Sequence, residues 1–296
     1  MRAAIAYRHR PTALHACRAT VAASFGASIV LAALIAANPV VLAALLVAVC
    51  GAASLASVAR EVRTAAAWTL VPLVAMTVIV NLLVSREGLT VFARLGDWAV
   101  LGQVNLTLEA LVYGLVTALR IVIVVLACVL AYCTADPDEL LAASRRWLPH
   151  SGLAAVLGTR MLPVLAADAA RLSQAQRCRA DGGATGARAR LAILRATVQG
   201  ALDRSLDVAA VLEMRGYGAG RRTRREHEPL SRHDIAFAAA AAAIVALALA
   251  STALASASFS VYPLIRAHFG FTALALGAAT VCAALLPFLD QRGVER

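Results

Sequence analysis

Six apolar runs, each long enough to cross a membrane, constrain most strongly what this chain can fold into. They lie at about residues 20–37, 40–58, 66–84, 106–133, 235–256 and 270–289. The hydrocarbon core of a bilayer is about 30 Å thick, and roughly 20 apolar residues in an α-helix cross it. Within lipid, each backbone N–H and C=O must find a partner inside the protein, which favours helices. The sequence therefore predicts an all-α fold, a polytopic membrane helical bundle of about six spans.

The composition also excludes an ordinary soluble domain. Of the 296 residues, 61% are hydrophobic and 15% are charged, with a mean hydropathy of +0.76. Soluble domains have about half apolar and a quarter charged residues. The net charge is +11, and all 28 basic residues are arginines. In a soluble protein such an excess would suggest a nucleic-acid partner.

The placement of the arginines gives the charge a different explanation. Residues 1–19, 59–65, 134–234 and 290–296 together hold 24 of the 28 arginines. These are the connections on one side of an alternating six-helix topology, and cytoplasmic loops carry the arginine excess in membrane proteins. The sequence therefore predicts a multi-pass plasma-membrane protein with both termini cytoplasmic and no nucleic-acid partner.

The first two apolar runs are separated only by Asn38-Pro39, a turn signal that predicts a tight helical hairpin. A cleavable signal peptide is the alternative interpretation of residues 1–37. The basic leader is long and a second apolar run follows directly, so a retained first helix is favoured.

Between the fourth and fifth runs lies a long segment with helical patterns but no predicted span. The chain thus divides into a four-span bundle at 1–133, a cytoplasmic region at 134–234, and two spans with a tail at 235–296. Asp136-Pro137-Asp138-Glu139 is typical of a helix start. A second helix is predicted from about 152 to 179, kinked at Pro163. A third is predicted from about 188 to 214, and Gly216 follows as a C-terminal cap.

The third of these helices is amphipathic. Its apolar residues recur at spacings of three and four: Leu191, Leu194, Val198, Leu202, Leu206, Ala209 and Leu212. Its polar residues recur at a spacing of four: Arg195, Gln199, Asp203 and Asp207. Such a helix lies on a membrane surface or packs against partner helices. We expect the leucine line to pack against another helix of the cytoplasmic region.

Two similar arginine motifs end the second and third cytoplasmic helices, Cys178-Arg179-Ala180 and Met214-Arg215-Gly216. An arginine at a helix C-terminus complements the helix dipole and still reaches out from the surface. The plain alternative is that these arginines merely end helices in an arginine-rich segment.

The order of features resembles the transmembrane T component of energy-coupling factor (ECF) transporters, a family of ABC importers that includes cobalt and biotin permeases. Besides Asn38-Pro39 and the two arginine motifs, the resemblance rests on five stretches: Asn81-Leu82-Leu83, Leu108-Glu109-Ala110-Leu111, Ala118-Leu119-Arg120-Ile121, Thr134-Ala135-Asp136-Pro137-Asp138-Glu139-Leu140 and Arg160-Met161-Leu162-Pro163-Val164-Leu165. In that family the motifs have the form Ala-Arg-Gly or Ala-Arg-Ser. Neither motif here begins with Ala, and Ala180 stands in the last place of the first motif.

The resemblance implies a non-catalytic coupling subunit. Its two long cytoplasmic helices would engage two ABC ATPases through Arg179 and Arg215. Its membrane bundle would hold a small substrate-binding membrane protein, the S component, for uptake of a vitamin or a transition-metal ion. The resemblance leaves open whether cobalt, nickel, biotin or another vitamin is carried.

No residue pattern in the chain predicts a metal site or a cofactor. The six cysteines form no CxxC pair, and the six histidines are scattered. The glycine-rich run 181–186 lacks the GK[ST] ending of a phosphate loop, so the chain is not expected to bind ATP.

Arg120 lies near the middle of the fourth span, and a charge there needs a polar partner or a function. Asn81 or backbone carbonyls are the expected internal partners, and a membrane protein partner is the alternative.

Two other functions remain as alternatives. A conventional ABC permease lines its own pathway and couples through one short cytoplasmic helix. A membrane-embedded enzyme acting on lipids or isoprenoids needs clustered carboxylates or histidines, and Asp136, Asp138 and Glu139 form the tightest acidic cluster.

Overall fold

The fold consists of helices with two short β-hairpins, divided into two compact units. The computed structural model describes residues 7–84, 91–98, 102–144, 151–178, 186–217, 219, 230–254, 259–260, 266–267 and 270–290. One unit comprises Met1–Leu140 with Leu230–Arg296, and the other comprises Leu141–Pro229. The first unit is called the bundle below.

The bundle begins with the predicted helical hairpin. Helix α1 spans Ala19–Ile35 and α2 spans Pro39–Leu55. The side chain of Asn38 accepts a hydrogen bond from the Val40 amide at 2.9 Å, and Pro39 occupies the first helical position. Asn at the N-cap and Pro directly after it are both favourable for a helix start. The hairpin prediction is confirmed.

The third and fourth predicted spans are also helices. Helix α3 (Ala59–Ala65) leads through a π-helical turn, η1 (Ala66–Leu70), into α4 (Val71–Val84). Helix α5 spans Leu108–Thr134, and the Thr107 side chain caps its first turn by accepting from the Ala110 amide at 3.3 Å.

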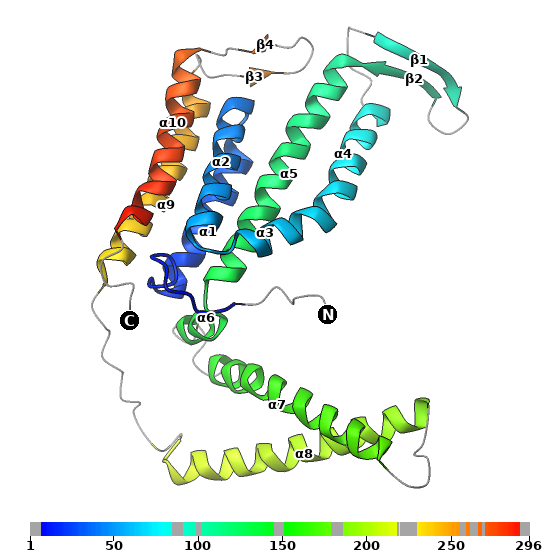
Figure 1. Cartoon of the computed structure of the whole chain (residues 1–296), viewed down its shortest axis with the longest axis vertical. Helices are drawn as coiled ribbons and strands as arrows, with labels where there is room; N and C mark the ends of the chain where they lie inside the picture. The colour runs from blue at the N-terminus through cyan, green and yellow to red at the C-terminus, as the bar shows by residue number, and fades with distance from the viewer. Residues whose placement is uncertain are drawn as a thin grey trace. The chain divides into compact units, whose positions relative to one another are not determined.

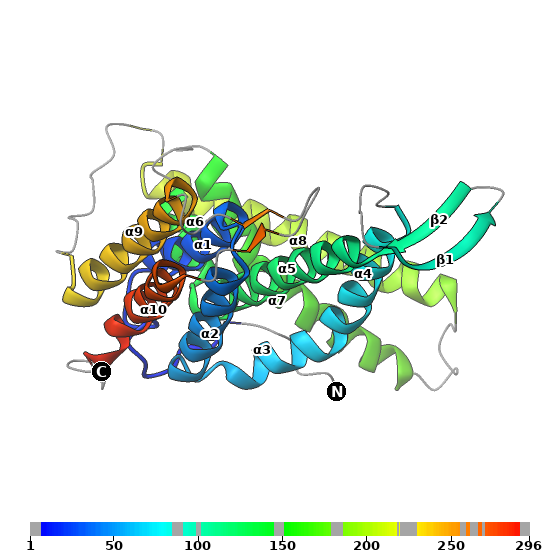
Figure 2. The ribbon, with the colours of Figure 1, turned by 90° about the horizontal axis from the view of Figure 1, so that it is seen from above.

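Helix α1 is the centre of the bundle, with α2, α5 and α9 packed around it (Figure 2). Gly26 of α1 lets α5 approach closely, because a Cβ there would lie only 2.5 Å from the Cβ of Ala131. Small residues at such contacts are typical of membrane helices, where close packing drives association. Three aromatic rings complete the core, Phe25, Phe237 and Phe288, with centroids 5.0 to 6.3 Å apart in edge-to-face arrangements.

The C-terminal part adds two further helices. Helix α9 spans Arg232–Ala253, and α10 spans Phe271–Leu285 and continues as a short 3₁₀ turn, η3 (Leu286–Leu289). Helix α10 packs against α2 and α9. All six predicted spans are thus apolar helices.

Two antiparallel hairpins were not predicted from the sequence. Strands β1 (Val91–Trp98) and β2 (Gly102–Thr107) pair between α4 and α5. Strands β3 (Phe259–Ser260) and β4 (Arg266–Ala267) pair between α9 and α10. Both lie at one end of the bundle, opposite the end that carries α3 (Figure 1).

The N-terminal segment before α1 is packed into the α3 end of the bundle. Five of its residues are buried: Thr12, Ala13, Leu14, His15 and Cys17. Arg10 pairs with Glu61 of α3 and donates to the Ser57 carbonyl. Residues 10–17 of the basic leader are therefore part of the folded bundle.

Among the residues that the structure describes, four helices are long and apolar enough to cross a membrane: Leu108–Thr134, Leu153–Arg177, Arg232–Ala253 and Phe271–Leu289. Helices α1, α2 and α4 are apolar but shorter. The second of the four, Leu153–Arg177, lies in a segment predicted to be cytoplasmic. This helix contains the charged residues Arg160, Asp168 and Arg171. Asp168 also pairs with Arg204, which lies on a helix that is too charged to span a membrane.

Candidate functional site

Two long helices that end in the arginine motifs form the candidate site. Helix α6 (Pro137–Ser144) precedes them, α7 spans Ser151–Arg177, and α8 spans Ala187–Met214. The predicted helices at 152–179 and 188–214 are therefore present with nearly the expected bounds. Pro163 lies inside α7, as predicted.

An ion pair joins α7 to α8. Asp168 of α7 accepts from both terminal nitrogens of Arg204 of α8, at 3.2 and 3.1 Å, through its Oδ2. Its other oxygen accepts from Arg171, one turn further along α7. Both carboxylate oxygens of Asp168 thus have cationic partners, which orients its side chain at the contact between the helices.

The residues of α8 that are partly covered lie on one face of the helix: Ala189, Ile193, Thr197, Ala201, Arg204, Val208 and Leu212. Their spacings of three and four identify one helical stripe. Arg204 belongs to this stripe and meets Asp168, so this face of α8 packs against α7.

Most of the leucine line of α8 is exposed, and of its members only Leu212 also belongs to the partly covered stripe. Leu191, Leu194, Val198, Leu202 and Leu206 are each between 48% and 69% exposed. The expectation that this line packs against another cytoplasmic helix is wrong. The 3.6-residue period identifies an apolar face but not its partner, and within this unit α7 contacts the stripe that contains Arg204. The leucine line is therefore available to another molecule or to lipid.

Arg215 is presented by a well-formed helix C-cap. The Gly216 amide donates to the Glu213 carbonyl at 2.8 Å, and the Tyr217 amide donates to the Leu212 carbonyl at 2.9 Å. Gly216 has φ of +73°, which glycine adopts without strain. These are the two hydrogen bonds of a Schellman motif, with Arg215 at the C-cap and Gly216 after it. Arg215 and Met214 are both exposed, and Met214 is 80% exposed.

The first motif begins in a similar setting. The Cys178 amide donates to the Gln174 carbonyl at 3.2 Å, directly after the end of α7, and Cys178 is exposed. Arg179 and Ala180 lie outside the described residues. The expected role of this motif, to engage one ATPase through Arg179 while Arg215 engages the other, stays a prediction.

The two motif arginines are separated in the sequence by the same interval as the two residues of the ion pair. Asp168 and Arg204 are 36 residues apart, and so are Arg179 and Arg215. Each motif arginine follows its member of the ion pair by eleven residues in the sequence. For Arg215, at the C-cap of α8, this is about three helical turns, or about 16.5 Å along the helix axis. Asp168 and Arg204 were not predicted as functional residues. The repeated interval of 36 residues was the signal in the sequence that could have identified them.

The two intramembrane polar candidates lie on neighbouring helices but have different partners. Arg120 of α5 donates to the Ala36 carbonyl at 2.9 Å, at the turn between α1 and α2. Asn81 of α4 donates to the Thr77 carbonyl at 2.9 Å. Arg120 therefore has a backbone partner of the kind expected, and Asn81 bonds within its own helix. Asn81 also contributes to the close contact of α4 with Gly114 of α5.

Within the described residues there is no group of three or more His, Cys, Asp or Glu side chains that could hold a metal ion. The six cysteines are unpaired thiols. In the glycine-rich run, Gly186 is described and has φ of +84° directly before α8. The remainder of that run, 181–185, lies outside the described residues.

Comparison with known proteins identifies the family. The family model described as CbiQ, cobalt transport protein, matches residues 11–226, which include the N-terminal segment, the first four spans and both arginine motifs. A comparison with curated proteins gives no match. The matched region is well over half of the chain and contains the helices and motifs described above. The chain therefore belongs to the CbiQ cobalt transport protein family, the T components of energy-coupling factor transporters.

Proposed function

We propose that this chain is the coupling subunit of an ECF importer. It receives ATP-driven movement from two ATPase subunits and passes it to a small substrate-binding membrane subunit that takes up a vitamin or a transition-metal ion. The observation that carries the proposal is the exposed Arg215 on its Schellman cap, at the end of a helix tied to α7. The chain itself is non-catalytic, because ATP is bound and hydrolysed by the partners.

Two ATPases are proposed because the site has two equivalent ends. The motif arginines follow Asp168 and Arg204 by the same number of residues. A symmetric ATPase dimer offers the same groove twice, which suits two arginines at the same sequence distance from the two partners of one ion pair. Closure of the dimer on ATP would move both helix ends together, as rigid elements between two states.

The substrate-binding subunit is proposed to dock on apolar surface. The leucine line of α8 provides such surface, and it is rimmed by the polar line of Arg195, Gln199, Asp203 and Asp207, which is exposed as well. A contiguous apolar face with a polar border is typical of a protein or membrane contact. Movement of α8 would then tilt the docked subunit.

The orientation of the chain supports the same scheme. The termini of α1, α5 and α9 that adjoin arginine-rich segments lie together at the α3 end of the bundle (Figure 1). By the arginine rule this end faces the cytoplasm. The chain leaves the bundle after Leu140 and returns to it at Leu230, next to the ends of α5 and α9 that lie here, so both connections to the motif helices are on the side where ATPases are found.

The alternative functions have less support. The acidic cluster that an enzyme would need is engaged in helix capping, since Asp136 accepts from the Asp138 amide at 2.9 Å and Glu139 accepts from the Ala19 amide at 3.0 Å. A conventional permease would couple through one short helix, whereas α7 and α8 have 27 and 28 residues.

The test is to substitute the motif arginines in the assembled transporter and to measure substrate uptake and co-purified ATPase. Charge-assisted hydrogen bonds of Arg179 and Arg215 are each worth about 1.5–3 kcal/mol. Arg→Lys should impair uptake, and the double substitution Arg179→Glu with Arg215→Glu should abolish ATPase recruitment or coupling. Membrane insertion should be unchanged. Arg177 and Arg221 are the matched controls, and equal mild effects at all four positions would overturn the proposal.

A further inference from the structure

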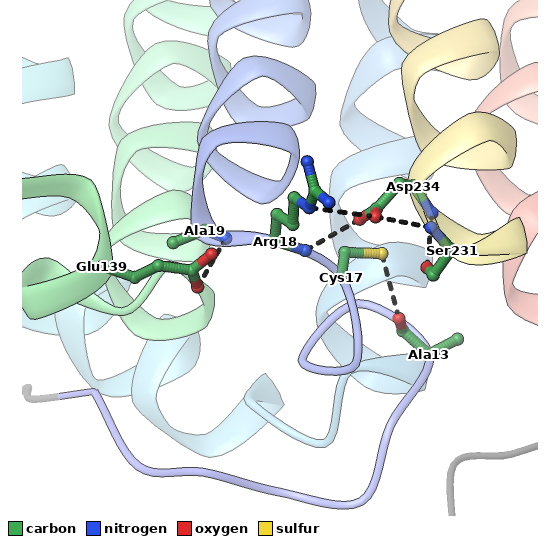
Figure 3. Close-up of polar contacts among 7 residues, drawn as sticks. All are labelled: Ala13, Cys17, Arg18, Ala19, Glu139, Ser231 and Asp234. Atoms are coloured by element: carbon green, nitrogen blue, oxygen red, sulfur yellow. Dashed lines mark hydrogen bonds and ion pairs between the residues drawn. The ribbon is translucent and has the colours of Figure 1, made fainter. Parts of the chain in front are cut away.

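The N-terminus of α1 is capped by carboxylates that come from two other segments of the chain. The first amides of a helix have no partner within it, and the N-cap residue of α1, Arg18, provides no side-chain cap of its own. Instead, the Arg18 amide donates to Asp234 Oδ1 at 2.8 Å, and the Ala19 amide donates to Glu139 Oε2 at 3.0 Å (Figure 3). Two consecutive amides therefore hold α6 and α9 at one point.

Asp234 is the buried member of this arrangement. It is 2% exposed, and its Oδ2 accepts from the Ser231 amide at 2.9 Å and lies 3.6 Å from the Arg18 Nε. The Ser231 hydroxyl in turn accepts from the Asp234 amide at 3.1 Å, which completes a capping box at the start of α9. A single carboxylate thus closes the N-terminus of its own helix and reaches α1. A buried carboxylate is tolerated only when it is fully paired in this way.

The Asp234 side of this site is buried, with Asp234 2% and Cys17 8% exposed. Burial raises the pKa of the Cys17 thiol to about 12, and the nearby Asp234 carboxylate contributes to the same effect. The protonated thiol donates to the Ala13 carbonyl at 3.2 Å (Figure 3). Water therefore competes little for the hydrogen bonds around Asp234.

The two carboxylates lie in the sequence at the two boundaries of the unit that contains α7 and α8. The unit that contains α7 and α8 comprises Leu141–Pro229. Glu139 lies just before the first residue of this unit, and Asp234 lies just after its last residue. Both covalent connections between that unit and the bundle are therefore fixed to adjacent amides of the central helix α1.

We propose that Glu139 and Asp234 are positioning residues that anchor both ends of the coupling unit to α1, so that movement of α7 and α8 is delivered to the centre of the bundle. This inference rests on the proposed function. Without the anchor, a displacement at either connection would be taken up by fraying of the first turn of α6 or α9. With it, the displacement acts on α1, which packs directly against α2, α5 and α9.

The experiment compares anchor variants with cap variants on the same two helices. Glu139→Ala removes the acceptor of the Ala19 amide, and Asp234→Asn weakens the acceptor of the Arg18 amide. The controls are Asp136→Ala and Ser231→Ala, which remove caps local to α6 and α9 without contact to α1. Each complex is purified with its ATPases and substrate-binding subunit and reconstituted in vesicles. ATP hydrolysis and substrate uptake are measured in the same preparation.

We expect both anchor variants to assemble and hydrolyse ATP, while uptake per ATP hydrolysed falls at least about five-fold, the lower end of typical coupling between sites. The controls should retain the wild-type ratio. An unchanged ratio in Glu139→Ala, or an equal fall in the controls, would overturn the anchor role. Because the Glu139 side chain is exposed, this variant decides the matter even where Asp234→Asn fails to fold. If the wild-type chain were purified and no ATPase subunits accompanied it, the proposed function and the anchor role would both be overturned.

Discussion

Asp168 of α7 and Arg204 of α8 form an ion pair that joins the two motif helices. The pair lies eleven residues before each motif arginine. Its side chains are 23% and 38% exposed, so solvent screens the attraction. Loss of the pair alone should cost no more than about 1 kcal/mol. Its importance lies in fixing the point at which the helices meet.

Charge reversal at this contact is the first prediction. Arg204→Glu places a second carboxylate beside Asp168, so the helices should separate or slide, and uptake should fall several-fold. Adding Asp168→Arg to this variant should restore much of the lost uptake, because the attraction between the two side chains returns. Uptake and co-purified ATPase are the measurements. Arg177→Glu, at the exposed end of α7, is the control and should have little effect. Failure of the second substitution to rescue the first would contradict the role of the pair.

The second prediction concerns the cap that presents Arg215. Gly216→Ala forces a side chain into φ of +73° and should cost about 1 kcal/mol. We expect about five-fold weaker ATPase binding in a titration of the purified subunits. Gly216→Asn should be milder, since Asn tolerates this conformation. Gly200→Ala on the same helix has open space around it and should leave binding intact.

Close packing of α1 on α5 gives the third prediction. Gly26→Ala places a Cβ only 2.5 Å from that of Ala131 and should destabilise the bundle by about 1–3 kcal/mol. Ala131→Gly should relieve the clash when combined with it. The Tm of the detergent-solubilised protein is the measurement, and Gly158→Ala, at an open position of α7, is the control. Additive losses in the double variant would contradict the packing.

The fourth prediction is a pH dependence that arises from His15. Burial lowers the pKa of His15 below 6.5, and the charges of Arg10 and His9 act in the same direction. The unfolded chain therefore binds a proton at higher pH than the folded chain. Stability from this group is complete above about pH 6.5 and is lost as the pH falls below it. Glu61 does not titrate in the same pH range as His15. Burial of Glu61 raises the pKa of its carboxyl, but the hydrogen bond and charge of Arg10 outweigh this effect and hold the pKa of Glu61 below 4.5.

The Tm should accordingly fall between about pH 7.5 and about pH 5.5, and His15→Gln should reduce this fall. His9→Gln, an exposed neighbour, should keep the wild-type dependence. An unchanged pH dependence in His15→Gln would refute the assignment.

The fifth prediction is the orientation of the chain in the membrane. Single cysteines at positions 90 and 262 should react with an impermeant thiol reagent added from outside, because they lie in the connections with few arginines. A cysteine at position 184 should react only after the membrane is opened. Labelling of position 184 from outside would refute the topology.

Much of the fold was predictable from local sequence signals. Asn38-Pro39 marked a turn because asparagine caps a helix and proline starts one, and Gly216 marked a helix end because it accepts a positive φ. Long-range contacts were not predictable in this way. The acidic cluster at 136–139 was attributed to capping of α6, but Glu139 caps α1, 120 residues away in the chain. The same limit explains why the leucine line was assigned to the wrong partner.

The exposure of α8 has a consequence for the supply of this subunit in the cell. No residue along its 28-residue length is buried within the chain. An orphan copy therefore displays several leucines on a helix held by few contacts, and such regions open readily and are recognised by chaperones and proteases. A copy covered by its partners is protected. Quality control would thereby match the number of surviving subunits to the number of partners, without a dedicated regulator of expression.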